Sequence, residues 1–397
     1  MYKLGTAADA ITVSHAYYSL RGQYPDDLEK ANQDAFKLVG AFNGNPAQLL
    51  LGVFDGHGEH GHECSQFVRD QVEQQLMQSI ALTPNEWPVA LTHCFTTLNA
   101  RMHKQARFPD NQSGTTAISC LLDGSTLWVA NIGDSRAVLG KTMPNGSVRA
   151  TAISDDQTPF RKDERERIRA AGGVVMSMSQ LTGEVPMHEN WGSEAGEEVD
   201  TDGDPPRVWL PGQETPGCAF TRSIGDAVGE RVGVFAEPEV AKSELKQHDR
   251  LLILASDGVW EFLTNQVVVE MAMQHTDPFE ACRHVVTEAY KLWLQFDVRS
   301  DDITMICAFL DHHDQGGPAS RSQVPNTAPA FSRDSSPPAA RGSAKSANRP
   351  VRHGMSQDKR RAISSFMDDA GEDDSELPSH AMSASALNRL VRSEREA

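Results

Sequence analysis

The chain has 397 residues, enough for one large domain or two ordinary ones, and carries 55 acidic against 37 basic side chains. The net charge of −18 argues against attraction to nucleic acid or to an anionic membrane surface. No signal-peptide pattern opens the sequence, and no segment reads as a membrane span. We therefore expect a soluble, cytoplasmic or nuclear monomer with no nucleic-acid or membrane partner.

Runs rich in Val, Ile, Leu and Thr predict strands, and apolar residues at helical spacing predict two amphipathic helices, 67–80 and 91–102. Three predicted strands follow one another closely between 115 and 140, which indicates antiparallel pairing and the α+β class. The predicted strands are 49–54, 115–122, 126–132, 135–140, 251–256 and 303–309.

Charge is unevenly distributed after these strands. Residues 161–167 read Arg-Lys-Asp-Glu-Arg-Glu-Arg, which predicts a solvent-exposed helix with paired charges. The segment 176–217, which follows Gly172-Gly173, is strongly acidic and has no Lys or Arg before Arg207. Taken alone, this pattern is typical of a solubilising loop. Eight acidic residues lie between Gly173 and Arg207: Glu184, Glu189, Glu194, Glu197, Glu198, Asp200, Asp202 and Asp204.

Composition divides the chain after residue 312. Residues 313–397 are rich in Ser, Ala, Pro and Arg, contain two aromatic residues, and cannot bury enough apolar surface to offset the entropy of ordering. We expect a folded domain over 1–312 and a disordered tail over 313–397. Ser336 and Ser364 lie in matches to kinase sites, and a short amphipathic stretch at 386–391 is either an incidental helix or a docking motif.

Six cysteines are scattered through the chain without a Cys-x-x-Cys pair or matching histidine spacing. This pattern predicts buried thiols in a reducing compartment rather than a zinc site.

Three aliphatic runs each have an aspartate at one end: Asp55, Asp257 and Asp301. A carboxylate at the end of a buried strand emerges at the rim of the sheet, where the rigid backbone fixes its position. One Asp-Gly turn means little, since it is common after a strand. Three such carboxylates at one edge would make an oxygen cage that suits magnesium or manganese, and this points to a metal-dependent hydrolase.

An ordered set of motifs carries a resemblance to a known family. The chain resembles the metal-dependent Ser/Thr protein phosphatases of type 2C over about 21–310. The resemblance implies an antiparallel β-sandwich flanked by helices, an αββα four-layer fold, with a binuclear magnesium or manganese site at the sheet edge. It also implies that segment 176–217 is an inserted flap beside the active site that selects substrates, as the alternative to a solubilising loop. The motifs are Asp55-Gly56-His57-Gly58, Ser113-Gly114-Thr115-Thr116, Asn131-Ile132-Gly133-Asp134, Ala171-Gly172-Gly173, Thr221-Arg222-Ser223-Ile224-Gly225-Asp226, Ala255-Ser256-Asp257-Gly258 and Asp301-Asp302-Ile303-Thr304.

The resemblance assigns metal roles residue by residue. Asp55 resembles the carboxylate that bridges the two ions, and Gly56 the residue whose carbonyl binds the second. Asp257 and Asp301 resemble the other carboxylates on the first ion, and Asp34 matches one that holds metal-bound water. This implies hydrolysis of phosphoserine and phosphothreonine in proteins by a hydroxide that bridges the metals.

Three further residues match with alternatives left open. His57 resembles the acid that protonates the departing Ser or Thr oxygen, although a His in a Gly-rich turn can also be a solvated loop residue. Asp134 resembles a ligand of a third metal, or is simply a turn residue beside Gly133. Glu261 stands where the family usually has Asp, and its extra methylene moves the carboxylate.

The first motif departs from the family pattern, which has an Arg before a Glu-Asp pair to grip the substrate phosphate. Here the pair is Gln33-Asp34, and the available cations are Arg21 and Lys30. We favour Lys30 as the phosphate-binding residue, acting as a point charge. These departures leave two alternatives to an active protein phosphatase: a catalytically inactive scaffold with the same fold, and a metal-dependent phosphoesterase acting on small molecules.

Overall fold

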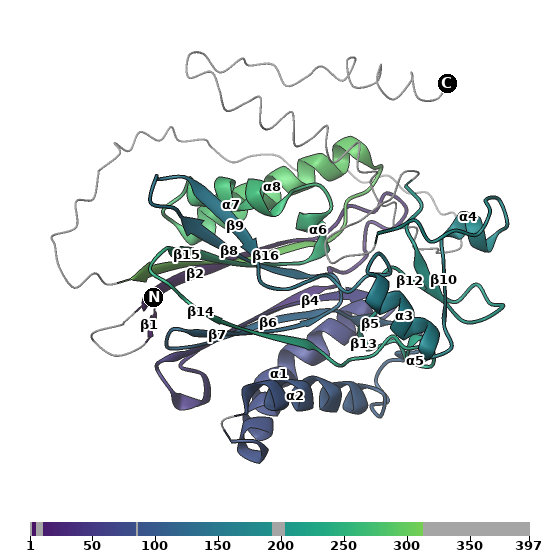
Figure 1. Cartoon of the computed structure of the whole chain (residues 1–397), viewed down its shortest axis with the longest axis horizontal. Helices are drawn as coiled ribbons and strands as arrows, with labels where there is room; N and C mark the ends of the chain where they lie inside the picture. Colours follow the sequence, from purple (N-terminus) through teal and green to yellow (C-terminus); the bar gives the residue numbers. More distant parts are fainter. Residues whose placement is uncertain (1, 5–10, 85, 193–202, 313–397) are drawn as a thin grey trace, which may run out of the picture.

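The computed structural model describes residues 2–4, 11–84, 86–192 and 203–312 (Figure 1). The predicted tail, 313–397, lies outside these ranges. So do five of the eight acidic residues between Gly173 and Arg207, namely Glu194, Glu197, Glu198, Asp200 and Asp202.

One antiparallel sheet contains the last two predicted strands. Its order is β1-β2-β16-β15-β8-β9, so the C-terminal strand lies in the interior beside β15. The strands are β1 (Tyr2–Leu4), β2 (Ile11–Leu20), β8 (Arg136–Thr142), β9 (Val148–Ala152), β15 (Asp249–Ala255) and β16 (Ile303–His312).

A second antiparallel sheet carries the first predicted strand. Its order is β13-β5-β4-β6-β7-β14, and β3 also pairs with β4. The predicted strand 115–122 is divided here between β5 and β6. The strands are β3 (Asp34–Gly40), β4 (Gln48–His57), β5 (Gly114–Thr115), β6 (Ala117–Asp123), β7 (Thr126–Ile132), β13 (Ile224–Gly225) and β14 (Glu239–Glu244).

The two sheets pack face to face between two pairs of helices (Figure 1). Strand β4 shows why its sequence is a continuous apolar run: Leu49 and Leu51 enter the core between the sheets, whereas Leu50 and Phe54 pack toward the helices. The expected αββα arrangement is thus confirmed. The helices are α1 (Gly61–Leu82) and α2 (Trp87–Met102) on one side, and α7 (Asn265–Met273) and α8 (Pro278–Phe296) on the other.

Segment 176–217 contributes to a small separate sheet of β10 (Val174–Met176), β11 (Arg207–Trp209) and β12 (Pro216–Cys218). Two of its described acidic residues have structural partners. Asp204 accepts hydrogen bonds from the first backbone amides of α4 (Met178–Leu181), and Glu189 pairs with Arg169. These two carboxylates therefore stabilise the segment itself.

All six cysteines lie in the described part of the chain, where each is buried and none forms a disulfide. Within the same residues, no helix is both long enough and apolar enough to cross a membrane.

The charged stretch 161–167 forms most of α3 (Lys162–Ala170), but the expectation of a solvent-exposed helix is wrong for one face. Glu164 is only 2% exposed in its side chain. It accepts hydrogen bonds from Arg167 at 2.6 Å, from Arg222 at 2.8 Å and from the Thr221 hydroxyl at 2.5 Å. Partners about 57 residues further along the chain make this burial tolerable, because a buried carboxylate must be paired.

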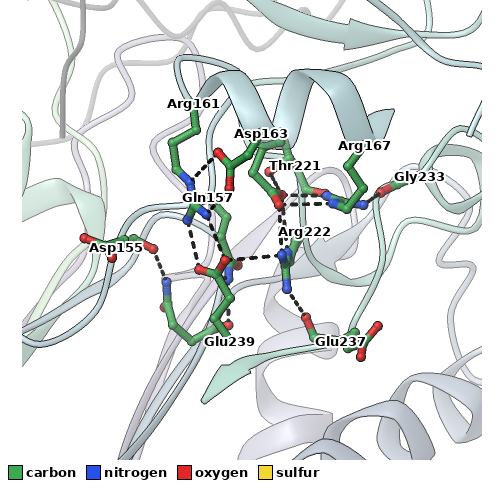
Figure 2. A network of polar contacts seen from close by, with 12 residues as sticks. Asp155, Gln157, Arg161, Asp163, Arg167, Thr221, Arg222, Gly233, Glu237 and Glu239 are labelled. Carbon is green, nitrogen blue, oxygen red and sulfur yellow. Dashed lines mark hydrogen bonds and ion pairs between the residues drawn. The ribbon is translucent and has the colours of Figure 1, made fainter. Parts of the chain in front are cut away.

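The network extends beyond Glu164 to strand β14 (Figure 2). Arg161 bonds both Asp163 and Glu239, and Arg222 also approaches Glu239. Although burial alone would raise the pKa of Glu164, the hydrogen bonds from Arg167 and Arg222 lower it to about 2. The network thus ties α3, the segment around Thr221 and β14 into one unit.

Glu164→Gln keeps the size of the side chain and removes its charge. Because Arg167 would then lose its buried counter-charge and Arg222 would keep only the half-buried Glu239, we expect the free energy of unfolding near neutral pH to fall by roughly 3 kcal/mol. Glu166→Gln, on the exposed face of α3, is the matched control, for which we expect a change within about 0.5 kcal/mol.

The effect should depend on pH with a definite sign. The pKa of Glu164 is lowered on folding, so its stabilisation is complete above the ordinary value of 4.5 and is lost as the pH falls toward 2. Denaturant unfolding at about pH 7 and about pH 3 should show the deficit of Glu164→Gln shrinking at the lower pH. An equal deficit at both pH values would contradict the account of the ion pair.

Candidate active site

Strands β3 and β4 bring two of the predicted ligands together. Asp34 and Asp55 are direct partners in the antiparallel register. The backbone of Asp55 exchanges hydrogen bonds with Thr116, whose amide donates to the Asp55 carbonyl at 2.8 Å. Gly56 follows where the chains approach so closely that a Cβ would lie 2.1 Å from the Gly61 carbonyl oxygen. This explains why glycine occupies that position.

The other sheet delivers Asp257 and Asp301 to the same rim. Ser256 joins the two sheets: its hydroxyl donates to Asp34 Oδ2 at 2.8 Å and accepts from the Thr304 amide at 3.0 Å. Asp257 begins α6 (Asp257–Trp260), directly after β15. A Cβ on Gly258 would lie 2.2 Å from the Asp302 carbonyl oxygen, so the turns that carry Asp257 and Asp301 are in contact.

Hydrogen bonding distinguishes the two adjacent aspartates of the last motif. Both carboxylate oxygens of Asp302 accept from buried backbone amides, Gly22 at 2.6 Å and Gln33 at 2.8 Å. Asp302 therefore fixes the N-terminal loop to β16. Asp301 instead accepts from the Tyr24 hydroxyl at 3.0 Å and from the Asp302 amide at 2.9 Å, both on Oδ1. These contacts support the choice of Asp301 as the ligand.

The electrostatics of the rim suit a cation. Burial raises the pKa of Asp34 well above its ordinary value, and the carboxylates of Asp302 and Asp301 raise it further. Within the described chain, Asp34 Oδ1 is buried and has no hydrogen-bond partner. One carboxylate oxygen of Asp55 and one of Asp257 are buried as well. An all-oxygen donor set with excess negative charge fits magnesium or manganese.

A different acidic group is the tightest one. Among the described residues, the ligand atoms of Asp163, Glu164 and Glu239 form the one group of three that lies within 4.8 Å. Each of these carboxylates is already engaged by arginine in the network of Figure 2. It is therefore a salt-bridge cluster. The predicted ligands at the rim are more widely spread.

The N-terminal loop shows which cation lies near the rim. Arg21 donates to the carbonyl oxygens of Leu28 and Lys30, so it closes its own loop. Lys30 lies with its ammonium 3.5 Å from the centre of the Tyr24 ring. Burial lowers the pKa of Lys30, while the carboxylate of Asp301 opposes the shift. Of these two cations, Lys30 is thus the one beside the predicted ligands.

Gln33 has a structural role that sequence reasoning missed. Its side-chain amide donates to the Gly58 carbonyl at 2.7 Å, and its own carbonyl accepts from the Gly56 amide at 3.1 Å. Gln33 therefore holds the turn that follows Asp55, although it lacks the charge of the Glu that the family pattern has there.

His57 is held by a residue to which sequence reasoning gave no role. Its Nε2 lies 2.5 Å from Asp226 Oδ2, and its ring packs on Phe220 with centroids 4.3 Å apart. Asp226 stands in a quoted motif, Thr221-Arg222-Ser223-Ile224-Gly225-Asp226, but no spacing rule joins it to a histidine 169 residues earlier. His57 is thus a packed residue rather than a solvated one.

The residues of the predicted third metal site lie at turns. Asp134 follows Gly133, whose φ of 96° needs glycine, between β7 and β8. Glu261 is the C-cap residue of α6, one turn after Asp257. The third site stays a prediction.

Comparisons with known proteins agree with this fold. The family model Protein phosphatase 2C matches residues 23–292. "Probable protein phosphatase 2C 35" from Arabidopsis thaliana is 43% identical over 293 residues, which are 74% of this chain and 82% of that protein. "Probable protein phosphatase 2C 72", also from Arabidopsis thaliana, is 33% identical over a match that covers 72% of this chain and 83% of that protein.

A solved structure has the same fold. The serine-threonine phosphatase 2C from Toxoplasma gondii superimposes with a TM-score of 0.60 at 20% identity, covering 78% of this chain and 98% of that one. The family match and the relatives decide the identity: this chain belongs to the protein phosphatase 2C family and is a metal-dependent protein serine/threonine phosphatase.

Proposed function

We propose that the chain hydrolyses phosphoserine and phosphothreonine in proteins with two magnesium or manganese ions at the sheet rim. Asp55 would hold both ions and the Gly56 carbonyl the second, with Asp257 and Asp301 on the first and Asp34 beside them. The observation that carries this proposal is the gathering of buried carboxylates from two sheets around Asp34, whose Oδ1 has no hydrogen-bond partner in the described chain.

The bound ions would supply a nucleophile from water near neutral pH and neutralise charge on the phosphoryl oxygens. The protein's own side chains would do the rest. Lys30 would bind the substrate phosphate, Tyr24 would orient Asp301, and His57 would give a proton to the departing oxygen. A serine alkoxide is a poor leaving group, so this proton matters for protein substrates.

Nothing observed favours the two alternatives. An inactive scaffold has no need to keep Asp55, Asp257 and Asp301 at one rim, and the relatives are named as protein phosphatases. The proposal of an active enzyme therefore rests on both the donor set and the family.

The pair Asp301 and Asp302 provides the direct test. Asp301→Asn should lower kcat on a phosphoserine peptide by at least about 100-fold with manganese supplied, because it removes a ligand, while the melting temperature stays near that of the wild type. Asp302→Asn should instead lower the melting temperature by several degrees, since two buried amides lose their charged acceptor.

Phosphopeptide turnover and thermal unfolding, measured side by side, separate the two roles. Wild-type turnover should vanish when a chelator removes the divalent ions. Full activity of Asp301→Asn at low manganese would refute the assignment of that ligand.

Lys30 is tested by substitution with Ala and with Arg. Lys30→Ala should raise KM for the phosphopeptide roughly 10-fold, which corresponds to the loss of one charged hydrogen bond, and Lys30→Arg should retain most of the affinity. Lys37 lies on β3 and pairs with Glu73 of α1, so Lys37→Ala offers the matched control. If Lys30→Ala leaves KM unchanged, another group binds the phosphate.

A further inference from the structure

Asp226 lies in a setting built around its carboxylate. It is only 2% exposed and sits at the end of the segment 220–226, against His57. Its backbone is left-handed, with φ 49° and ψ 50°, a conformation in which Asp is among the few tolerated residues. Gly114 leaves the necessary room, since a Cβ there would lie 2.4 Å from Asp226 Oδ2.

The hydrogen bonds of Asp226 define the state of the His57 ring. Asp226 Oδ2 accepts from the Ser223 hydroxyl at 2.6 Å as well as facing His57 Nε2 at 2.5 Å. An ionised carboxylate can only accept, so Nε2 carries a hydrogen. The other ring nitrogen, Nδ1, is buried and has no hydrogen-bond partner among the residues that the structure describes. Nδ1 is thus the nitrogen left for a reacting group.

The segment that carries Asp226 is anchored from two sides. From α2, the Asn99 side-chain oxygen accepts from the Gly225 amide at 2.9 Å. From α3, Glu164 binds the Thr221 hydroxyl and the Arg222 guanidinium, in the network of Figure 2. Phe220, at the start of the segment, packs its ring against the ring of His57. The buried network therefore fixes the segment whose Phe220 and Asp226 contact His57.

We propose that Asp226 is a positioning residue for His57, which it holds with the Nε2–H bonded to its carboxylate and with Nδ1 directed to the substrate. This inference rests on the proposed role of His57 as the acid. In that step an oxygen derived from water forms a new bond to phosphorus while the P–O bond to serine or threonine breaks, and the electron pair of the broken bond goes to the leaving oxygen. That oxygen takes the proton from Nδ1, and the neutral ring keeps the Nε2–H on Asp226.

The mode of action is the one known for a carboxylate that orients a catalytic imidazole. It predicts a dependence on the leaving group. A serine oxygen needs the proton, whereas a nitrophenolate leaves without one. A residue that only stabilised the fold would affect both substrates alike.

The experiment compares kcat on a phosphoserine peptide and on p-nitrophenyl phosphate, with manganese supplied to full-length protein. Asp226→Asn should lower kcat on the peptide by about 10- to 100-fold and on the nitrophenyl ester by far less. His57→Ala should show the same selectivity with a larger loss, about 100-fold or more. The decisive variant is the double mutant, which should be no slower than His57→Ala alone.

Glu237→Gln is the matched control, because Glu237 is exposed and contacts Arg222 through its main-chain carbonyl (Figure 2). It should leave both rates unchanged. Ser223→Ala offers a second route if Asp226→Asn does not fold. It removes the other hydrogen bond to Asp226 Oδ2 and should give a smaller loss with the same selectivity.

The outcomes separate the acid role of His57 from the positioning role of Asp226. If His57→Ala slows both substrates equally, the acid role of His57 fails. If His57→Ala is selective but Asp226→Asn and Ser223→Ala are not, or if the losses of His57→Ala and Asp226→Asn multiply in the double mutant, the positioning role of Asp226 is overturned while the proposed function stands.

Discussion

Mutual repulsion of buried carboxylates at one rim is the constraint on which the rest of the structure depends. Burial and the neighbouring carboxylates raise the pKa of Asp34 and of Asp302, and Asp55 lies opposite Asp34 in the same sheet. Such a group is unfavourable unless backbone amides, hydroxyls or cations compensate it. The fold provides the first two, and the family is metal-dependent.

Compensation is distributed so that some oxygens stay available. Asp302 is fully engaged by two amides, and Ser256 binds one oxygen of Asp34 while leaving the other without a hydrogen bond in the described chain. The rigid packing of the two sheets allows this selectivity, because each group enters the rim from the end of a buried strand. A second charged network, around Glu164, fixes the position of the segment that contacts His57. In that network arginine side chains already bind the carboxylate oxygens of Glu164.

The sheets and their rim could be predicted because strands β4, β15 and β16 are continuous apolar runs that end or begin with aspartate. The burial of Glu164 could not, since the sequence 161–167 looks like any exposed charged helix and its partners Thr221 and Arg222 come from a later motif. The contact between Asp226 and His57 could not be predicted either. Its motif is visible in the sequence, but the left-handed backbone that aims its carboxylate at His57 appears only in the fold.

The most direct test of the rim as a cation site is thermal unfolding of the metal-free protein with and without manganese. An ion that binds only the folded state at about 100 times its Kd should add about 2.7 kcal/mol of stability per site. We expect manganese to raise the melting temperature of the wild type and of the exposed control Asp70→Asn, but not of Asp55→Asn. An equal rise in Asp55→Asn, or none in the wild type, would contradict the account.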